Sequence, residues 1–187
     1  MIYDIKAVAP LGQRSVDNMG KVIIVIQIIA LLMGGFFMTA QAADKNGERV
    51  LLEKNLSEMI RLYGEESTHS IYAMAAVADA YREQGELVQV VALREKNMLL
   101  CKKTMGENHP TTLIAMNNLA VSYKAIGRYG EAVVLYQQVL AIRTDTLGEE
   151  DLSTLLSMNN LAVAFNALGR HLDASILQEK VVALRRS

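Results

Sequence analysis

Residues 106–145 read GENHPTTLIAMNNLAVSYKAIGRYGEAVVLYQQVLAIRTD, and residues 148–187 repeat the pattern as GEEDLSTLLSMNNLAVAFNALGRHLDASILQEKVVALRRS. The two copies lie 42 residues apart, and 18 of their 40 aligned positions are identical. A fixed period in the range of about 20 to 50 residues is typical of solenoid proteins, in which similar units stack on one another. The repeat therefore predicts a solenoid, a kind of fold that presents a binding surface more often than a catalytic centre.

The same period continues towards the N-terminus. Residues 64–105 form a weaker third copy, and residues 46–63 align with the second half of a repeat. We therefore predict one repeat domain over residues 43–187, with a half repeat at 46–63 and full repeats at 64–105, 106–147 and 148–187.

Each repeat has the apolar pattern of two helices. Met116, Leu119 and Tyr123 recur at steps of three and four residues, which places them on one helical face. Gly127 interrupts this pattern, and a second apolar face follows between residues 132 and 140. No stretch alternates with a period of two, so the predicted fold is all-α, an α-solenoid of antiparallel helix pairs.

Other residues mark the expected ends of these helices. Gly106 and Gly148 occupy the position just past a helix end, where glycine is favoured. Ser67, His109 and Asp151 then stand at the position of the N-cap of the next helix.

Both strong copies carry the pattern NNLA, then Tyr or Phe, then Gly-Arg, and Leu147-Gly148-Glu149 links them. This pattern resembles the 42-residue tetratricopeptide repeat of the kinesin light chain type. The resemblance covers residues 64–187 and is strongest in 106–187, because Ala75-Ala76 replace the asparagine pair in the first copy. It implies a superhelix with a concave groove that binds other proteins; it does not imply a role in motor transport.

The resemblance also implies a binding site in that groove. Asn118 and Asn160 are expected to hydrogen-bond the backbone of an extended peptide, because an amide both donates and accepts. Asn117 and Asn159 are weaker candidates; the alternative is that one asparagine of each doublet braces the neighbouring helix. The expected apolar neighbours in the groove are Ile114, Val121, Leu156 and Val163. The predicted strip lacks a cluster of Lys and Arg, so a clamp for a terminal carboxylate is not expected.

The N-terminal segment reads as a secretory signal. Residues 22–38 carry no charge, Lys21 precedes them, and Ala40-Gln41-Ala42 offers a cleavage site after Ala42. We expect residues 1–42 to be removed on export to the periplasm or the exterior. The alternative is an uncleaved anchor in the inner membrane, since residues 22–38 can just span about 30 Å of hydrocarbon.

Charge and composition argue against several functions. Residues 43–187 hold 16 Lys and Arg against 18 Asp and Glu, whereas nucleic-acid binding favours a basic face. The single cysteine, Cys101, has no partner for an internal disulfide. His69, His109 and His171 are not spaced as metal ligands, and no catalytic motif is present. We therefore expect no enzymatic activity, no cofactor and no metal site.

The last helix suggests a second interaction surface. The sequence ends directly after it, so we expect apolar residues to be partly exposed at this end: Ile176, Leu177, Val181, Val182 and Leu184. Exposed apolar patches often mark contact sites.

The leading prediction is a scaffold that binds a peptide of a protein partner in the concave groove. The alternative is a membrane-tethered or self-associating subunit that acts through its C-terminal end.

Overall fold

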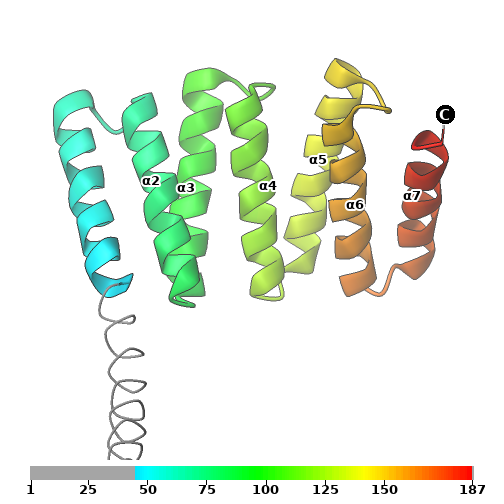
Figure 1. Ribbon diagram of the computed structural model, residues 1–187, viewed down its shortest axis with the longest axis horizontal. Helices are drawn as coiled ribbons and strands as arrows, with labels where there is room; N and C mark the ends of the chain where they lie inside the picture. Colours follow the sequence, from blue (N-terminus) through cyan, green and yellow to red (C-terminus); the bar gives the residue numbers. More distant parts are fainter. Residues whose placement is uncertain (1–44, 187) are drawn as a thin grey trace, which may run out of the picture. The chain divides into compact units, whose positions relative to one another are not determined.

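A computed structural model describes residues 45–186 (Figure 1). This part of the chain holds seven helices and no strand, which confirms the all-α prediction for it. The first helix covers residues 45–63, and the others are α2 (Thr68–Glu83), α3 (Leu87–Met105), α4 (Pro110–Ala125), α5 (Tyr129–Leu147), α6 (Leu152–Ala167) and α7 (His171–Leu184). The predicted signal or anchor segment, residues 1–42, lies outside the described residues.

Successive helices run in opposite directions, and each of α2 to α6 packs against the helix that follows it (Figure 1). The pairs α2/α3, α4/α5 and α6/α7 fall within residues 64–105, 106–147 and 148–187. In a solenoid, each repeat packs against the repeats next to it in the chain. Helix faces that the neighbours do not cover therefore recur along the stack at the 42-residue period. None of the described helices combines the length and apolar character that a bilayer crossing requires.

The first helix of each pair begins at a capped end. The side chain of Ser67 accepts a hydrogen bond from the Ser70 amide, and His109 Nδ1 accepts one from the Thr111 amide at 3.2 Å. Asp151 Oδ1 accepts from the Ser153 amide at 2.7 Å. Such bonds satisfy amides that have no partner inside the helix. The three predicted N-caps are therefore confirmed.

The second helices of the first two pairs, α3 and α5, each end at a glycine that turns the chain. Gly106 and Gly148 have φ angles of +91° and +86°, which other residues rarely adopt. The chain reverses within a few residues, and the next first helix begins at Pro110 or Leu152. The predicted helix ends at these two glycines are confirmed.

Small residues bring the helices close together in the core. Ala78, Ala120 and Ala162 occupy the same repeat position, and each is at most 1% exposed. The largest cluster of buried residues spans the second and third repeats and includes Met116, Leu119, Tyr136, Leu161 and Phe165. This core fixes the orientation of α4 and α6, and with it the side chains on their exposed faces.

Candidate functional site

Large apolar residues remain exposed at equivalent positions of the first helices. Tyr72, Ile114 and Leu156 are 58%, 53% and 50% exposed, and Val121 and Val163 are 39% and 47% exposed. Positions i, i+4 and i+7 of a helix share one face, so the asparagine between Ile114 and Val121 lies on the same surface. We call this surface the first-helix strip; its residues are Tyr72, Asp79, Ile114, Asn118, Val121, Leu156, Asn160 and Val163.

The asparagine doublets divide into two roles. Asn160 Nδ2 donates a hydrogen bond to Asn117 Oδ1 at 2.9 Å, which joins α6 to α4. One asparagine of each doublet thus braces a neighbouring helix, which is the alternative that the sequence left open. The side-chain amides of Asn118 and Asn159 make no hydrogen bond with another described residue. Asn118 cannot make the equivalent bond to the first repeat, because that repeat has Ala75 at the position of Asn117.

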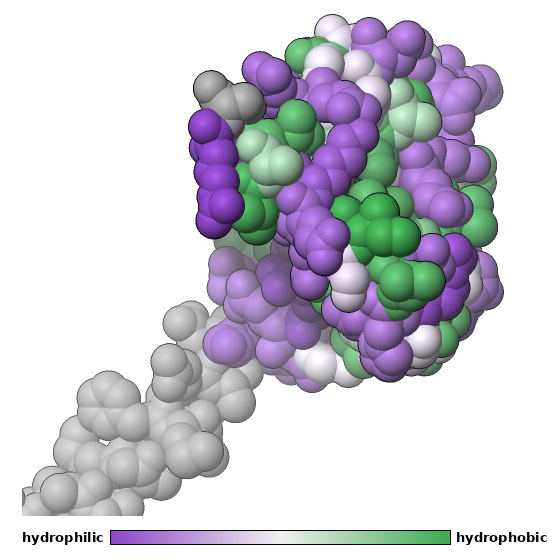
Figure 2. All heavy atoms as spheres, turned by 90° about the vertical axis from the view of Figure 1, so that its right-hand side faces the viewer, coloured by the Kyte–Doolittle hydropathy of each residue, from purple (hydrophilic) through white to green (hydrophobic). Residues whose placement is uncertain are grey.

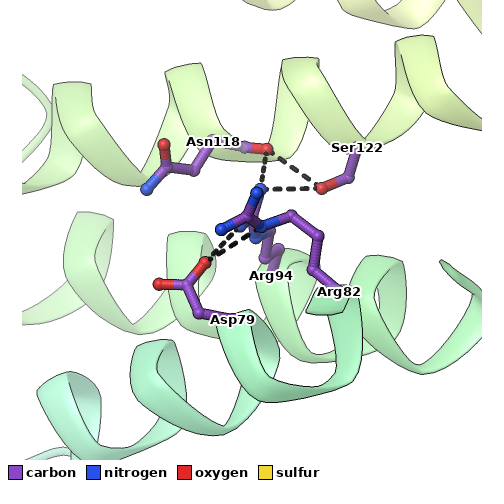
Figure 3. A network of polar contacts seen from close by, with 5 residues as sticks. All are labelled: Asp79, Arg82, Arg94, Asn118 and Ser122. Carbon is purple, nitrogen blue, oxygen red and sulfur yellow. Dashed lines mark hydrogen bonds and ion pairs between the residues drawn. The ribbon is translucent and has the colours of Figure 1, made fainter. Parts of the chain in front are cut away.

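A buried arginine holds the backbone at Asn118. Arg94 of α3 is 8% exposed; its Nη1 donates to the Asn118 carbonyl at 2.6 Å and to Ser122 Oγ at 2.9 Å. Its Nη2 donates to Asp79 Oδ1 at 2.7 Å, and Arg82 lies 3.5 Å from the same oxygen. Figure 3 shows that the Asn118 side chain points away from this network. Arg94 therefore fixes the helix that presents the Asn118 amide without occupying that amide.

The sequence did not reveal this role of Arg94. The equivalent residue of the second repeat is Tyr136, which is 1% exposed, so the position reads as an apolar core site. The available signal was a charged residue at a repeat position that holds Tyr136 in the second repeat and the uncharged Gln178 in the third.

Two tyrosines connect their helices to the helix before. Tyr123 Oη donates to Glu95 Oε1 at 2.7 Å, and Tyr81 Oη donates to Glu53 Oε1 at 2.5 Å. Burial, together with the Glu95 bond, raises the pKa of Tyr123 to about 12. Since acceptors inside the fold keep these phenols protonated, the two hydroxyls link neighbouring helices rather than act as acid–base groups. Phe165 occupies the same position in the third repeat and has no such bond.

Within residues 45–186, no group of three or more His, Cys, Asp and Glu side chains is placed to hold a metal ion.

The apolar residues of α7 differ in their exposure. Val181 is buried, Leu177 and Leu184 are half-buried, and Ile176 and Val182 are exposed. The exposure of Ile176 is not specific to this end, because its counterpart Val134 on α5 is 53% exposed.

The outward face of α7 carries mainly polar residues. Ser175 and Gln178 stand where α5 has the buried residues Val133 and Tyr136, so two packing positions of α5 are polar on α7. Figure 2, which faces this end, shows hydrophilic residues around separate hydrophobic patches. The expectation of partly exposed apolar residues at this end is confirmed for Ile176, Leu177, Val182 and Leu184, whereas Val181 is buried.

Comparison with known proteins identifies the repeat. Residues 70–145 and 123–187 match the family model described as tetratricopeptide repeat. The chain is a tetratricopeptide repeat protein. No curated protein sequence matches it significantly.

Solved structures place this tetratricopeptide repeat protein beside kinesin light chain-like repeats. The crystal structure of the Podosopora anserina putative kinesin light chain nearly identical TPR-like repeats is 31% identical, with a TM-score of 0.70. The match covers 76% of this chain and 68% of that one. A variant form of the same repeats is 32% identical, with a TM-score of 0.70 over 78% of this chain and 70% of that one.

A third structure shares the fold alone. BtubC (BKLC) from P. vanneervenii is 18% identical, with a TM-score of 0.69 over 77% of this chain and 57% of that one. Together the matches confirm the resemblance drawn from the sequence. Tetratricopeptide repeats are generally protein-interaction modules, and no catalytic family is evident for this chain.

Proposed function

We propose that this tetratricopeptide repeat protein is a non-catalytic scaffold that holds an extended peptide segment of a partner protein along the first-helix strip. The observation that carries the proposal is the row of exposed apolar residues on α2, α4 and α6, with the amide of Asn118 beside it and unpaired within the fold. Apolar burial supplies roughly 25 cal/mol for each Å² removed from water, and the amides orient the bound backbone.

Both strip amides keep hydrogen-bonding capacity for a ligand. An asparagine side chain has two N–H donors and an oxygen that accepts. Asn118 uses none of them within the described residues, and Asn160 uses one donor on Asn117. Each neutral hydrogen bond to a peptide group adds only about 1 kcal/mol net, so the asparagines set register more than total affinity.

The strip favours a peptide with apolar side chains. Its exposed large residues are uncharged, and its one acidic member, Asp79, is paired with Arg94 and Arg82. Because an amide pairs with any peptide group, the asparagines do not select particular side chains. Selectivity then depends on how the apolar side chains of the peptide fit between Tyr72, Ile114 and Leu156.

The compartment of the partner follows from residues 1–42. If these residues direct export, the partner is a protein of the periplasm or the exterior; an uncleaved segment would instead hold the scaffold at the membrane. The intact mass of protein purified from the source organism distinguishes the two, because cleavage after Ala42 removes a defined mass.

The proposal is tested by affinity capture with two matched double variants. Val121→Ser with Val163→Ser changes the strip, whereas Val134→Ser with Ile176→Ser changes similarly exposed residues of the second helices at the same 42-residue spacing. We expect the strip variant to lose the protein captured by the wild type and the control variant to keep it. Equal capture by both variants would contradict the proposal.

A further inference from the structure

A pocket of about 340 Å³ lies where α4, α5 and α6 meet. Its apolar wall includes Pro110, Ile114 and Leu147, and its polar groups include Asn108 and Arg143. Ile114 also belongs to the first-helix strip, so the pocket is continuous with the proposed peptide surface.

Arg143 brings a positive charge to this pocket and is not held in an ion pair. Its Nη1 donates to the Ser153 carbonyl at 3.0 Å and to Ser157 Oγ at 2.8 Å, and it forms no ion pair with any carboxylate of the described residues. Burial lowers the pKa of Arg143, and Asp151 acts in the opposite direction. The Asp151 carboxylate accepts from the Ser153 amide as the cap of α6 and lies beyond ion-pair distance of Arg143.

The unused side of this guanidinium has a defined geometry. Nε and Nη2 make no hydrogen bond within the described residues, and together they form one edge of the planar group. That edge offers two parallel N–H donors, which match the two oxygens of a carboxylate. Because this edge is not used inside the fold and carries a positive charge, an anionic group is a fitting occupant.

The equivalent place between the first and second repeats has different residues. Cys101 stands there instead of Arg143 and is fully buried, and Tyr72 replaces Ile114. The Tyr72 hydroxyl reaches to 3.5 Å from Thr111 Oγ1, across the position where the second interface has its pocket. Ile114 and Arg143 therefore distinguish the pocket between the second and third repeats from the equivalent place between the first and second.

We propose that Arg143 binds a carboxylate of the peptide held on the first-helix strip, while Pro110 and Leu147 contact the apolar part of the same residue. This inference rests on the proposed function, since it assigns a chemical preference to the bound segment. The carboxylate belongs either to an acidic side chain or to the chain terminus, because both present the same pair of oxygens.

The test uses small probes that do not depend on the partner. The ¹H–¹⁵N signal of Arg143 Nε in the full chain, assigned by its loss in Arg143→Gln, is followed during titration with three compounds. N-acetyl-leucine carries a terminal carboxylate, the α-amide of N-acetyl-glutamic acid carries a side-chain carboxylate, and N-acetyl-leucinamide is the neutral control. We expect at least one carboxylate to shift the signal saturably and to bind about tenfold more tightly than the amide. The tighter of the two carboxylates identifies the source.

Two variants distinguish the contribution of the pocket to probe binding from that of the Arg143 charge and from that of the strip amides. Ile114→Tyr keeps Arg143 but places a larger side chain at the pocket wall, as Tyr72 does between the first and second repeats, so it is expected to weaken carboxylate binding several-fold. Asn118→Ala with Asn160→Ala leaves the pocket intact and is expected to bind the probes like the wild type even if it loses the partner. Probe binding thus tests the pocket independently of the proposed function. Equal binding of the neutral amide, or no saturable shift with either carboxylate, would overturn the proposal.

Discussion

Asn160 Nδ2 donates a hydrogen bond to Asn117 Oδ1 at 2.9 Å, although the two residues lie 43 positions apart in the chain. The separation is one repeat plus one residue, so the bond joins the second asparagine of one doublet to the first asparagine of the doublet before it. The pairing leaves Asn118 and Asn159 without internal partners. The same sequence motif therefore supplies both a brace between repeats and a free amide on the first-helix strip.

The brace makes a measurable contribution to stability. Asn117→Ala is expected to lower the free energy of unfolding by about 0.5 to 1.5 kcal/mol, because Asn160 loses its partner. Asn159→Ala is the matched control at the same repeat position, and we expect it to change stability by less than about 0.5 kcal/mol. Urea denaturation of both variants measures the difference. Equal losses would show that the Asn117–Asn160 bond contributes nothing specific.

Arg94 is expected to be far more important for stability than its exposed partner. Arg94→Ala removes the donors to Asn118 and Ser122 and the packing of a buried side chain, at a cost of about 2 to 4 kcal/mol. Asp79→Ala removes the ion pairs of a 52% exposed carboxylate with Arg94 and Arg82 and should cost less than Arg94→Ala, because Arg94 Nη1 keeps its bonds to Asn118 and Ser122. Thermal and urea unfolding of the two variants test this order. A larger effect of Asp79→Ala would contradict the assigned role of Arg94.

Ionisation of Tyr136 is expected to lower the stability of the fold at alkaline pH. Burial raises its pKa to about 12 in the folded chain, whereas an exposed tyrosine titrates near about 10. The folded state therefore binds more protons than the unfolded state between these values, and stability falls as the pH rises through this window. Its contribution is complete below about pH 10 and declines by roughly 1.4 kcal/mol per pH unit above it.

The matched variant for this effect is Tyr136→Phe, which keeps the ring and removes the titrating hydroxyl. The free energy of unfolding of this variant should fall less steeply between about pH 10 and about pH 12 than that of the wild type. Parallel curves would show that Tyr136 does not titrate differently in the folded state.

The positions of most helices could be predicted from the repeat sequence. The 42-residue period gave the helix pairs, and the caps at Ser67, His109 and Asp151 gave the starts of the first helices. These are local features, because a cap or a helical face depends on residues within a few positions of one another. The exposure of Ile114 and Leu156 was predictable for the same reason, since it follows from which side of the helix carries the buried residues.

The features that cross from one repeat to the next could not be predicted. Whether Asn160 meets Asn117 or Asn118 depends on the stagger of α4 against α6, and the period does not determine this stagger. Arg94 is buried and Arg143 is half-buried, and both donate hydrogen bonds to residues of the next repeat. The pocket beside Arg143 is lined by residues of α4, α5 and α6 and of the links between them, so it appears only once these helices are packed.

The most direct test of the strip is the affinity of the captured partner for three forms of the chain. Asn118→Ala with Asn160→Ala removes both strip amides, and Asn117→Ala breaks the same brace but keeps them. Loss of two hydrogen bonds of about 1 kcal/mol each predicts binding weaker by about thirtyfold for the double variant, with unchanged helix content. Asn117→Ala should bind within about threefold of the wild type, since its effect is on stability. Undiminished binding by the double variant would contradict the proposed role of the strip.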